Sequence, residues 1–215
     1  MKRMIISLLL LTSSLAYSQQ TPLKHMLKTY FRIHPFDMKF TTFILNLQKD
    51  PWFTIQEFYR RTDTTFFYLS GSYKNFNPFR YTPTEIKLVV AEQQIIHVDS
   101  LHTVDTVIAL QLMALSDTTT ENKNAAAKEF KRFHKNQEEF FYNINYNNYK
   151  KGSTIVGEIE NYFVYPLSIA PVTVAWGLLP ETNQCIFTIT VRFKLKENLA
   201  NYIAAPWEKF GDPVE

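Results

Sequence analysis

Apolar and polar residues alternate with great regularity near the C-terminal end of the chain. One set of alternate positions holds Cys185, Phe187, Ile189, Val191, Phe193 and Leu195, and the other holds Thr188, Thr190, Arg192, Lys194 and Lys196. Successive side chains of a strand point to opposite faces of its sheet, so this spacing predicts a half-buried antiparallel strand. Much of the core must therefore be built on antiparallel sheet.

Shorter segments predict further strands over 52–60, 64–73, 85–92, 95–99 and 172–178. The pattern over 106–115 is ambiguous, and we favour a strand there because the segment opens with Thr-Val-Ile and has no helix cap. We expect Gln93-Gln94 to be a turn, and we expect loops over 75–84 and over the Asn- and Tyr-rich segment 143–152. Apolar residues at helical spacing predict helices over 22–31, 37–49 and 122–142. Asp37 is the expected N-cap of the second helix.

The predicted elements follow in the order helices, strands, one helix, strands, and this order is typical of an α+β fold. We predict antiparallel sheet with amphipathic helices packed on one face. Lys39-Phe40-Thr41-Thr42-Phe43 resembles Glu129-Phe130-Lys131-Arg132-Phe133, which raises the alternative of two duplicated helix-plus-sheet units that meet near 116–122. This spacing is common in amphipathic helices, so a single domain over 19–215 is the preferred interpretation.

The first 18 residues have the layout of a secretory signal. A basic start, Met1-Lys2-Arg3, is followed by an apolar run, and Ala16-Tyr17-Ser18 places small residues before a cleavage point. The run is shorter than the roughly 20 residues that a bilayer requires. We interpret 1–18 as a cleaved signal peptide, and we expect an exported protein, periplasmic or extracellular, that does not span the membrane.

Removing Lys2 and Arg3 leaves 21 basic residues against 20 acidic ones. A nearly neutral chain is a poor partner for nucleic acid, so none is predicted. Cys185 is the single cysteine, and no intramolecular disulfide can form. Because Cys185 lies on the apolar face of its predicted strand, we expect an inert core residue rather than a nucleophile.

The glycines argue against nucleotide binding. Gly152 and Gly157 have the spacing of a phosphate loop, but Glu158-Ile159 follows where lysine and a hydroxyl residue are needed. The Gly-x-Ser-x-Gly motif of serine hydrolases is also missing. We predict no nucleotide and no cofactor, and we favour a non-enzymatic role over an enzymatic one.

Two groups of residues are candidates for catalysis or metal binding. His97, Asp99 and His102 offer imidazole and carboxylate ligands that suit zinc, on a strand end and the turn after it. Glu158 and Glu160 share one face of a strand at a separation seen in glycosidases. Apolar residues occupy the opposite face, so we expect the two glutamates on the solvent side of an outer strand.

Basic residues gather on the third predicted helix, at Lys128, Lys131, Arg132, His134 and Lys135. Such a cluster among aromatic residues can hold a polyanion or a glycan, although nearby glutamates favour an ordinary solvated helix face. Tyr146, Tyr149 and Lys150 follow in the Asn/Tyr segment. These three are the predicted binding residues, because exposed tyrosines are typical of interfaces.

The function we predict is that of a non-enzymatic binding protein of the cell envelope, whose partner is an envelope protein or a surface polymer. Two alternatives stay open: a cavity protein for a small apolar ligand, and a metal-dependent hydrolase. Aromatic residues make up 15% of the chain. Aromatic residues at this spacing can fill a core, line a cavity or form an exposed patch, so the sequence pattern does not distinguish these three arrangements.

Overall fold

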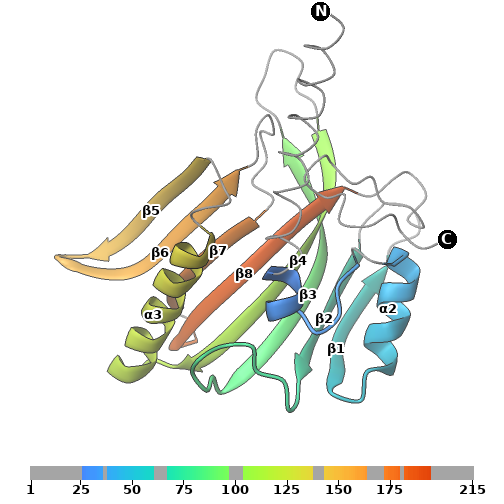
Figure 1. Cartoon of the computed structure of the whole chain (residues 1–215), viewed down its shortest axis with the longest axis horizontal. Coiled ribbons are helices and arrows are strands. Elements are labelled where there is room, and N and C mark those ends of the chain that lie inside the picture. Colours follow the sequence, from blue (N-terminus) through green and yellow to red (C-terminus); the bar gives the residue numbers. More distant parts are fainter. Residues whose placement is uncertain are drawn as a thin grey trace, which may run out of the picture.

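The computed structural model describes residues 26–35, 38–60, 67–96, 104–137, 143–163, 172–179 and 182–194. Their strands form one 8-stranded antiparallel sheet in the order β1-β2-β3-β4-β8-β7-β6-β5 (Figure 1). The fold is therefore α+β with sheet predominating. The predicted signal peptide lies outside the described residues.

The elements follow one another in two similar series. A short helix over 26–30 comes first, and then α2 (Phe40–Lys49) precedes β1 (Phe53–Arg60), β2 (Phe67–Tyr73), β3 (Glu85–Ile96) and β4 (Val104–Asp117). α3 (Thr120–Gln137) precedes β5 (Asn143–Lys151), β6 (Thr154–Phe163), β7 (Val172–Leu179) and β8 (Gln184–Lys194). β4 pairs with β8, so the two series join at the middle of the sheet.

The strand register places one residue of every strand in a single row across the sheet. The row runs through Phe58, Leu69, Val90, Leu110, Val191, Val172, Tyr162 and Ile144. Directly paired residues of antiparallel strands point to the same face. The row therefore gives the sheet one continuous apolar face, on which most of these side chains are buried.

Aromatic side chains connect the helices to this face. The Phe40 ring of α2 contacts the rings of Phe67 on β2 and Phe193 on β8, with centroids 5.3 and 6.4 Å away. The Phe133 ring of α3 lies 5.6 Å from the ring of Tyr162 on β6. Figure 1 shows α3 over β6–β8 and α2 beside β1. All these rings belong to one buried cluster, so they fill a core.

Two predicted connections are strands in the structure. Gln93 and Gln94 continue β3, because they pair with Val107 and Thr106 of β4. The segment predicted as a loop over 143–152 is largely β5, paired with β6 from Asn143 to Lys151. Asparagine disfavours strands, but cross-strand pairing overrides this weak local preference.

The ends of the helices also differ from the prediction. Lys39, not Asp37, is the N-cap residue of α2. α3 begins at Thr120, because the Thr119 hydroxyl oxygen accepts a hydrogen bond from the backbone N–H of Asn122 at 3.1 Å. It is described as far as Gln137, and residues 138–142 of the predicted helix lie outside the described part.

The strand with the cleanest alternation is buried on both faces over much of its length. Phe187 and Ile189 are fully buried as predicted, but Thr188 and Thr190 are only 8% and 5% exposed. β8 is a central strand, and its threonines lie opposite the longer Met113 and Gln111 of β4. We conclude that these longer neighbours shield the short threonine side chains. The prediction of a solvent-facing side at these positions was wrong.

None of the helices in the described part of the chain combines the length and apolar character needed to cross a bilayer.

Gly71 should be essential to the packing of β1 on β2. A Cβ atom at this position would lie 2.4 Å from Cζ of Phe53 and 2.5 Å from the carbonyl oxygen of Thr54. We expect Gly71→Ala to lower the free energy of unfolding by about 1–3 kcal/mol, the usual cost of overpacking. Denaturant unfolding of the purified chain measures this.

Gly177→Ala is the matched control, because a Cβ at Gly177 meets its nearest neighbours at 3.7 Å, an ordinary contact. Equal stability losses in the two variants would contradict the predicted role of Gly71.

Candidate functional site

The predicted binding residues all lie on β5, one of the two outer strands of the sheet. Tyr146 is 44% exposed and Tyr149 59% exposed. Their register places the two rings on opposite faces of the sheet. Tyr146 pairs with Glu160 and Tyr149 pairs with Gly157, and positions 157 and 160 lie on opposite faces of β6. Lys150 follows a shift in register and pairs with Ile155. The three residues therefore share one edge of the sheet but not one face.

Tyr146 is held in place by β6. Its hydroxyl donates a hydrogen bond of 2.8 Å to Oε1 of Glu158. Partial burial of the hydroxyl and this bond to a carboxylate both raise the pKa of Tyr146. The ring is thus an ordered, neutral platform at the sheet edge.

Glu158 and Glu160 are buried, contrary to the prediction that they face solvent. Their exposed fractions are 9% and 4%. The register explains the error, because Glu158 pairs with Trp176, and Glu160 with Val174, on the core-facing side of β7. The isoleucines of β6 face the other way, and Ile155 is 41% exposed.

Each buried carboxylate is supplied with hydrogen-bond donors. Glu158 accepts from Tyr146 and, through Oε2, from Nε1 of Trp176 at 2.6 Å. Glu160 accepts from the Tyr162 hydroxyl at 2.5 Å, and Nδ1 of His134 lies 3.0 Å from its oxygens. A carboxylate is costly to bury without such partners. The glutamates therefore act here as fixed acceptors, and the His134–Glu160 contact ties α3 to β6.

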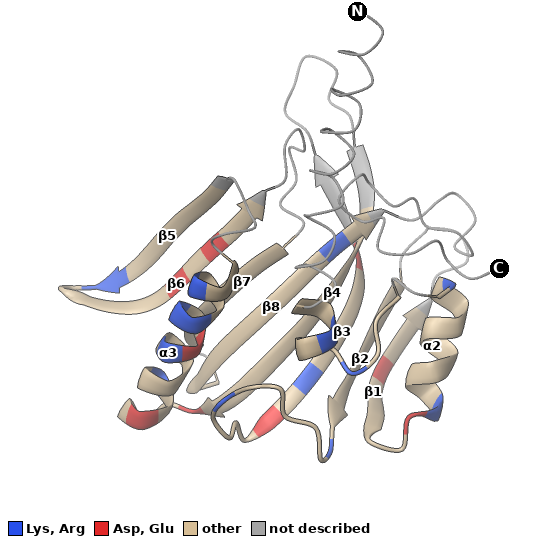
Figure 2. Cartoon of the chain, in the orientation of Figure 1, with Lys and Arg blue, Asp and Glu red and all other residues tan. Residues whose placement is uncertain are grey.

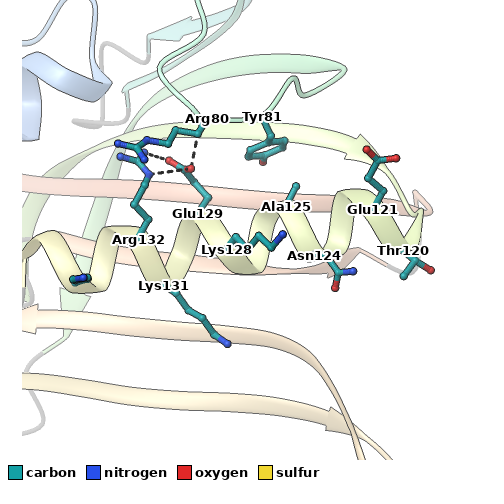
Figure 3. Close-up of a pocket in the computed structure, with 11 residues that line it drawn as sticks. Arg80, Tyr81, Thr120, Glu121, Asn124, Ala125, Lys128, Glu129, Lys131 and Arg132 are labelled. Carbon is teal, nitrogen blue, oxygen red and sulfur yellow. Dashed lines mark hydrogen bonds and ion pairs between the residues drawn. The ribbon is translucent and has the colours of Figure 1, made fainter.

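A groove lies between α3 and the loop over 74–84. Its volume is about 980 Å³, and Figure 3 shows the side chains that line it. The loop contributes Arg80 and Tyr81, and α3 contributes Thr120, Glu121, Asn124, Ala125, Lys128, Glu129, Lys131, Arg132 and Lys135. Most of the basic cluster predicted on this helix therefore lines a groove, while His134 turns to the sheet.

A polar network forms part of the lining of the groove. Arg132 forms an ion pair with Glu129 and donates a 2.9 Å hydrogen bond to the Tyr30 hydroxyl. Glu129 is buried and also accepts from the backbone N–H of Arg80 at 3.4 Å (Figure 3). Burial raises the pKa of Tyr30 to about 12 against the opposing charge of Arg132. Burial by itself would lower the pKa of Arg132, but the hydrogen bonds with Glu129 and Tyr30 outweigh it and raise this pKa above its ordinary value.

The three lysines that line the groove are available to bind a ligand. Lys128, Lys131 and Lys135 have no ion-pair partner within the part of the chain that the structure describes. Figure 2 shows several blue bands of Lys and Arg along α3. Lys128 and Lys135 are two turns apart, so they lie on the same side of the helix.

The proposed zinc ligands His97, Asp99 and His102 lie outside the described residues. Within the described ranges, no group of three or more His, Cys, Asp or Glu side chains is placed to hold a metal ion. Cys185 is buried, as predicted for a core residue, and burial raises the pKa of its thiol.

Sequence reasoning missed the partners that complete these sites. Arg80 and Tyr81 belong to a loop far from α3 in sequence, so no local pattern connects them. Trp176 was assigned to a strand without a polar role. One signal was available: Tyr162 has the same parity as Glu158 and Glu160, and a large aromatic in phase with them indicates a core-facing side.

Comparison with models of known protein families, with curated proteins and with solved structures gave no match.

Two tyrosine hydroxyls allow a matched test of the buried carboxylates. Tyr162 is fully buried, whereas Tyr146 is 44% exposed, and each donates to one glutamate. We expect Tyr162→Phe to lower the free energy of unfolding by about 1.5–3 kcal/mol, since it removes a buried hydrogen bond to a charged group. For Tyr146→Phe we expect a loss of less than about 1 kcal/mol, because water can replace the hydroxyl.

Denaturant unfolding of both variants checks this pair. A Tyr162→Phe protein as stable as the Tyr146→Phe protein would show that Glu160 does not depend on its buried donor.

Proposed function

We propose that the chain is an exported, non-enzymatic binding protein of the cell envelope, and that an extended segment of an envelope protein pairs with the outer edge of β5. The observation that carries this proposal is the unprotected state of that edge. The order of the sheet ends at β5, and the described residues place no strand on its outer side. Such an edge presents unpaired backbone N–H and C=O groups that can accept another strand.

The two edges of the sheet differ in their protection. β1 carries Glu57 and Arg60, has a shift in register after Ile55, and lies beside α2. β5 is uncharged from Asn143 to Tyr149, and both its lysines and its own shift in register, between Tyr149 and Lys150, come only at the end of the strand (Figure 2). Charges, bulges and covering helices are the usual means of blocking edge-to-edge pairing. The contrast favours β5 as the edge left open for a partner.

The aromatic residues of β5 add side-chain recognition to this backbone pairing. Tyr149 is among the most exposed large side chains of the described chain, and Tyr146 is oriented by Glu158. Tyrosines of this kind are enriched at interfaces because they bury a large area at low entropic cost. Lys150 adds a positive charge beside them.

The architecture that we infer for this function is a pair of helix-plus-sheet units whose helices cover one face of the joined sheet. Each unit is one helix followed by four strands. The contacts of Phe40 with Phe67, and of Phe133 with Tyr162, support a shared face. β1 and β5, the first strands of the two units, then become the two outer edges.

The described aromatic residues favour this function over a ligand cavity. The Phe40 ring contacts the rings of both Phe67 and Phe193, and the Tyr30 ring contacts that of Phe133. Rings in mutual contact leave no room between them for a small apolar ligand.

Photo-crosslinking in the cells that naturally make the protein tests the proposal. A crosslinking residue is placed at Asn145 or Asn147, which are both exposed on β5. The control positions are Thr54 on β1 and Gln48 on α2, which are exposed as well. We expect one defined envelope protein to be crosslinked from the β5 positions alone. With that protein purified, Tyr149→Ala should weaken binding by about tenfold or more, as for an interface hot spot.

Several outcomes would contradict the proposal. Adducts only between copies of the chain would make β5 a dimer edge, and adducts only with polysaccharide would make the partner a surface polymer. Turnover of an ester, glycoside or peptide that is lost on changing one acidic residue or histidine would make the protein an enzyme.

A further inference from the structure

We propose that the groove along α3 is a second binding site, independent of β5, and that it holds an acidic polysaccharide whose carboxylates contact Lys128, Lys131 and Lys135. The observation behind it is the combination of an open groove of about 980 Å³ with a row of lysines along one wall.

The length and spacing of the groove suit an extended ligand. Its lining residues run along α3 from Thr120 to Lys135, roughly 22 Å at the rise of an α-helix. Lys128, Lys131 and Lys135 are spread over about 10 Å of this length, so they can meet successive charges of a chain better than one compact anion.

The charges of the groove point to an anion of low charge density. Lys128, Lys131 and Lys135 are free of ion pairs within the described residues, whereas Arg132 is committed to Glu129. Glu121 also lines the groove, whereas the Glu129 carboxylate is paired with Arg132. The Glu121 carboxylate would repel a dense polyphosphate, and the nearly neutral mature chain gives little long-range attraction for nucleic acid.

The uncharged lining residues suit the hydroxyl groups and the ring faces of a sugar. Thr120 and Asn124 offer hydroxyl and amide groups for sugar hydroxyls, and the aromatic ring of Tyr81 faces the helix across the groove (Figure 3). Burial strongly raises the pKa of Tyr81, so its hydroxyl stays neutral. Lysine ammonium groups, aromatic surface and neutral donors together favour a polymer of sugar acids over a lipid or a peptide.

The walls are held by contacts that do not involve the three lysines. The hydrogen bond from the Arg80 backbone N–H to Glu129 connects the loop to α3, and the ion pair of Arg132 with Glu129, within α3, holds that carboxylate in place. Replacing the exposed lysines should therefore leave the groove in shape. This separates ligand binding from folding in the experiment.

Calorimetric titration of the mature chain with a hexamer of uronic acid tests the assignment. We expect binding that weakens as salt is added, and that falls about tenfold or more when Lys128, Lys131 and Lys135 are all changed to glutamine. The matched control changes Lys28, Lys49 and Lys74 to glutamine, because these lysines are exposed and lie outside the groove. The control should bind like the unmodified chain, and so should Tyr149→Ala, which alters only the β5 edge.

A neutral hexasaccharide and a single-stranded oligonucleotide are the comparison ligands. No binding of the uronic acid hexamer, an equal loss in the control variant, or equally tight binding of the neutral sugar would overturn the proposal. Tighter binding of the oligonucleotide would assign the groove to nucleic acid instead. Thermal unfolding of each variant shows that a loss of binding is not a loss of fold.

Discussion

The pairing of β4 with β8 is the interaction on which the rest of the structure depends. It joins the first four strands to the last four, and its register carries the apolar row from Val90 through Leu110 and Val191 to Val172. A shift of one residue would turn the apolar side of one half toward the opposite face, because side chains alternate with period two. Leu110 and Val191 are both fully buried, so such a shift would expose core from either half.

The candidate sites depend on this register in different ways. The row that includes Leu112, Ile189 and Val174 ends at Glu160 on β6 and Tyr146 on β5. The carboxylates are thus set on the core-facing side, where His134 of α3 can reach Glu160. The groove lies between α3 and the loop over 74–84, and β5 is the last strand on its side of the described sheet.

Much of the fold could be predicted from local pattern, and the errors came from pairing across the sheet. The alternation over 185–193 identified the core side of β8, and helical spacing located α2 and α3. Burial of Thr188 and Thr190 could not be seen, because it depends on neighbours from β4. The strand at β5 was missed because Asn-rich sequence indicates a loop, whereas pairing with β6 decides its conformation.

The candidate sites were predictable only where their residues lie close together in sequence. Lys128, Lys131 and Lys135 stand out at helical spacing, but the opposite wall of their groove comes from Arg80 and Tyr81. The glutamates of β6 were noticed as a pair, yet apolar neighbours at Ile155 and Ile159 suggested the wrong face. Only the register with β7, which sets Glu158 opposite Trp176, resolves the orientation.

Hydrogen exchange of backbone amides tests most directly whether the β4–β8 pairing makes the chain one cooperative unit. The measurement follows the amides of Leu69, Leu110, Ile189 and Val174 in the purified chain under increasing denaturant. We predict that all four exchange only through global unfolding, with one free energy and one dependence on denaturant. The account would be contradicted if Leu69 and Leu110 stayed protected while Ile189 and Val174 exchanged at a lower free energy, since the two halves would then unfold separately.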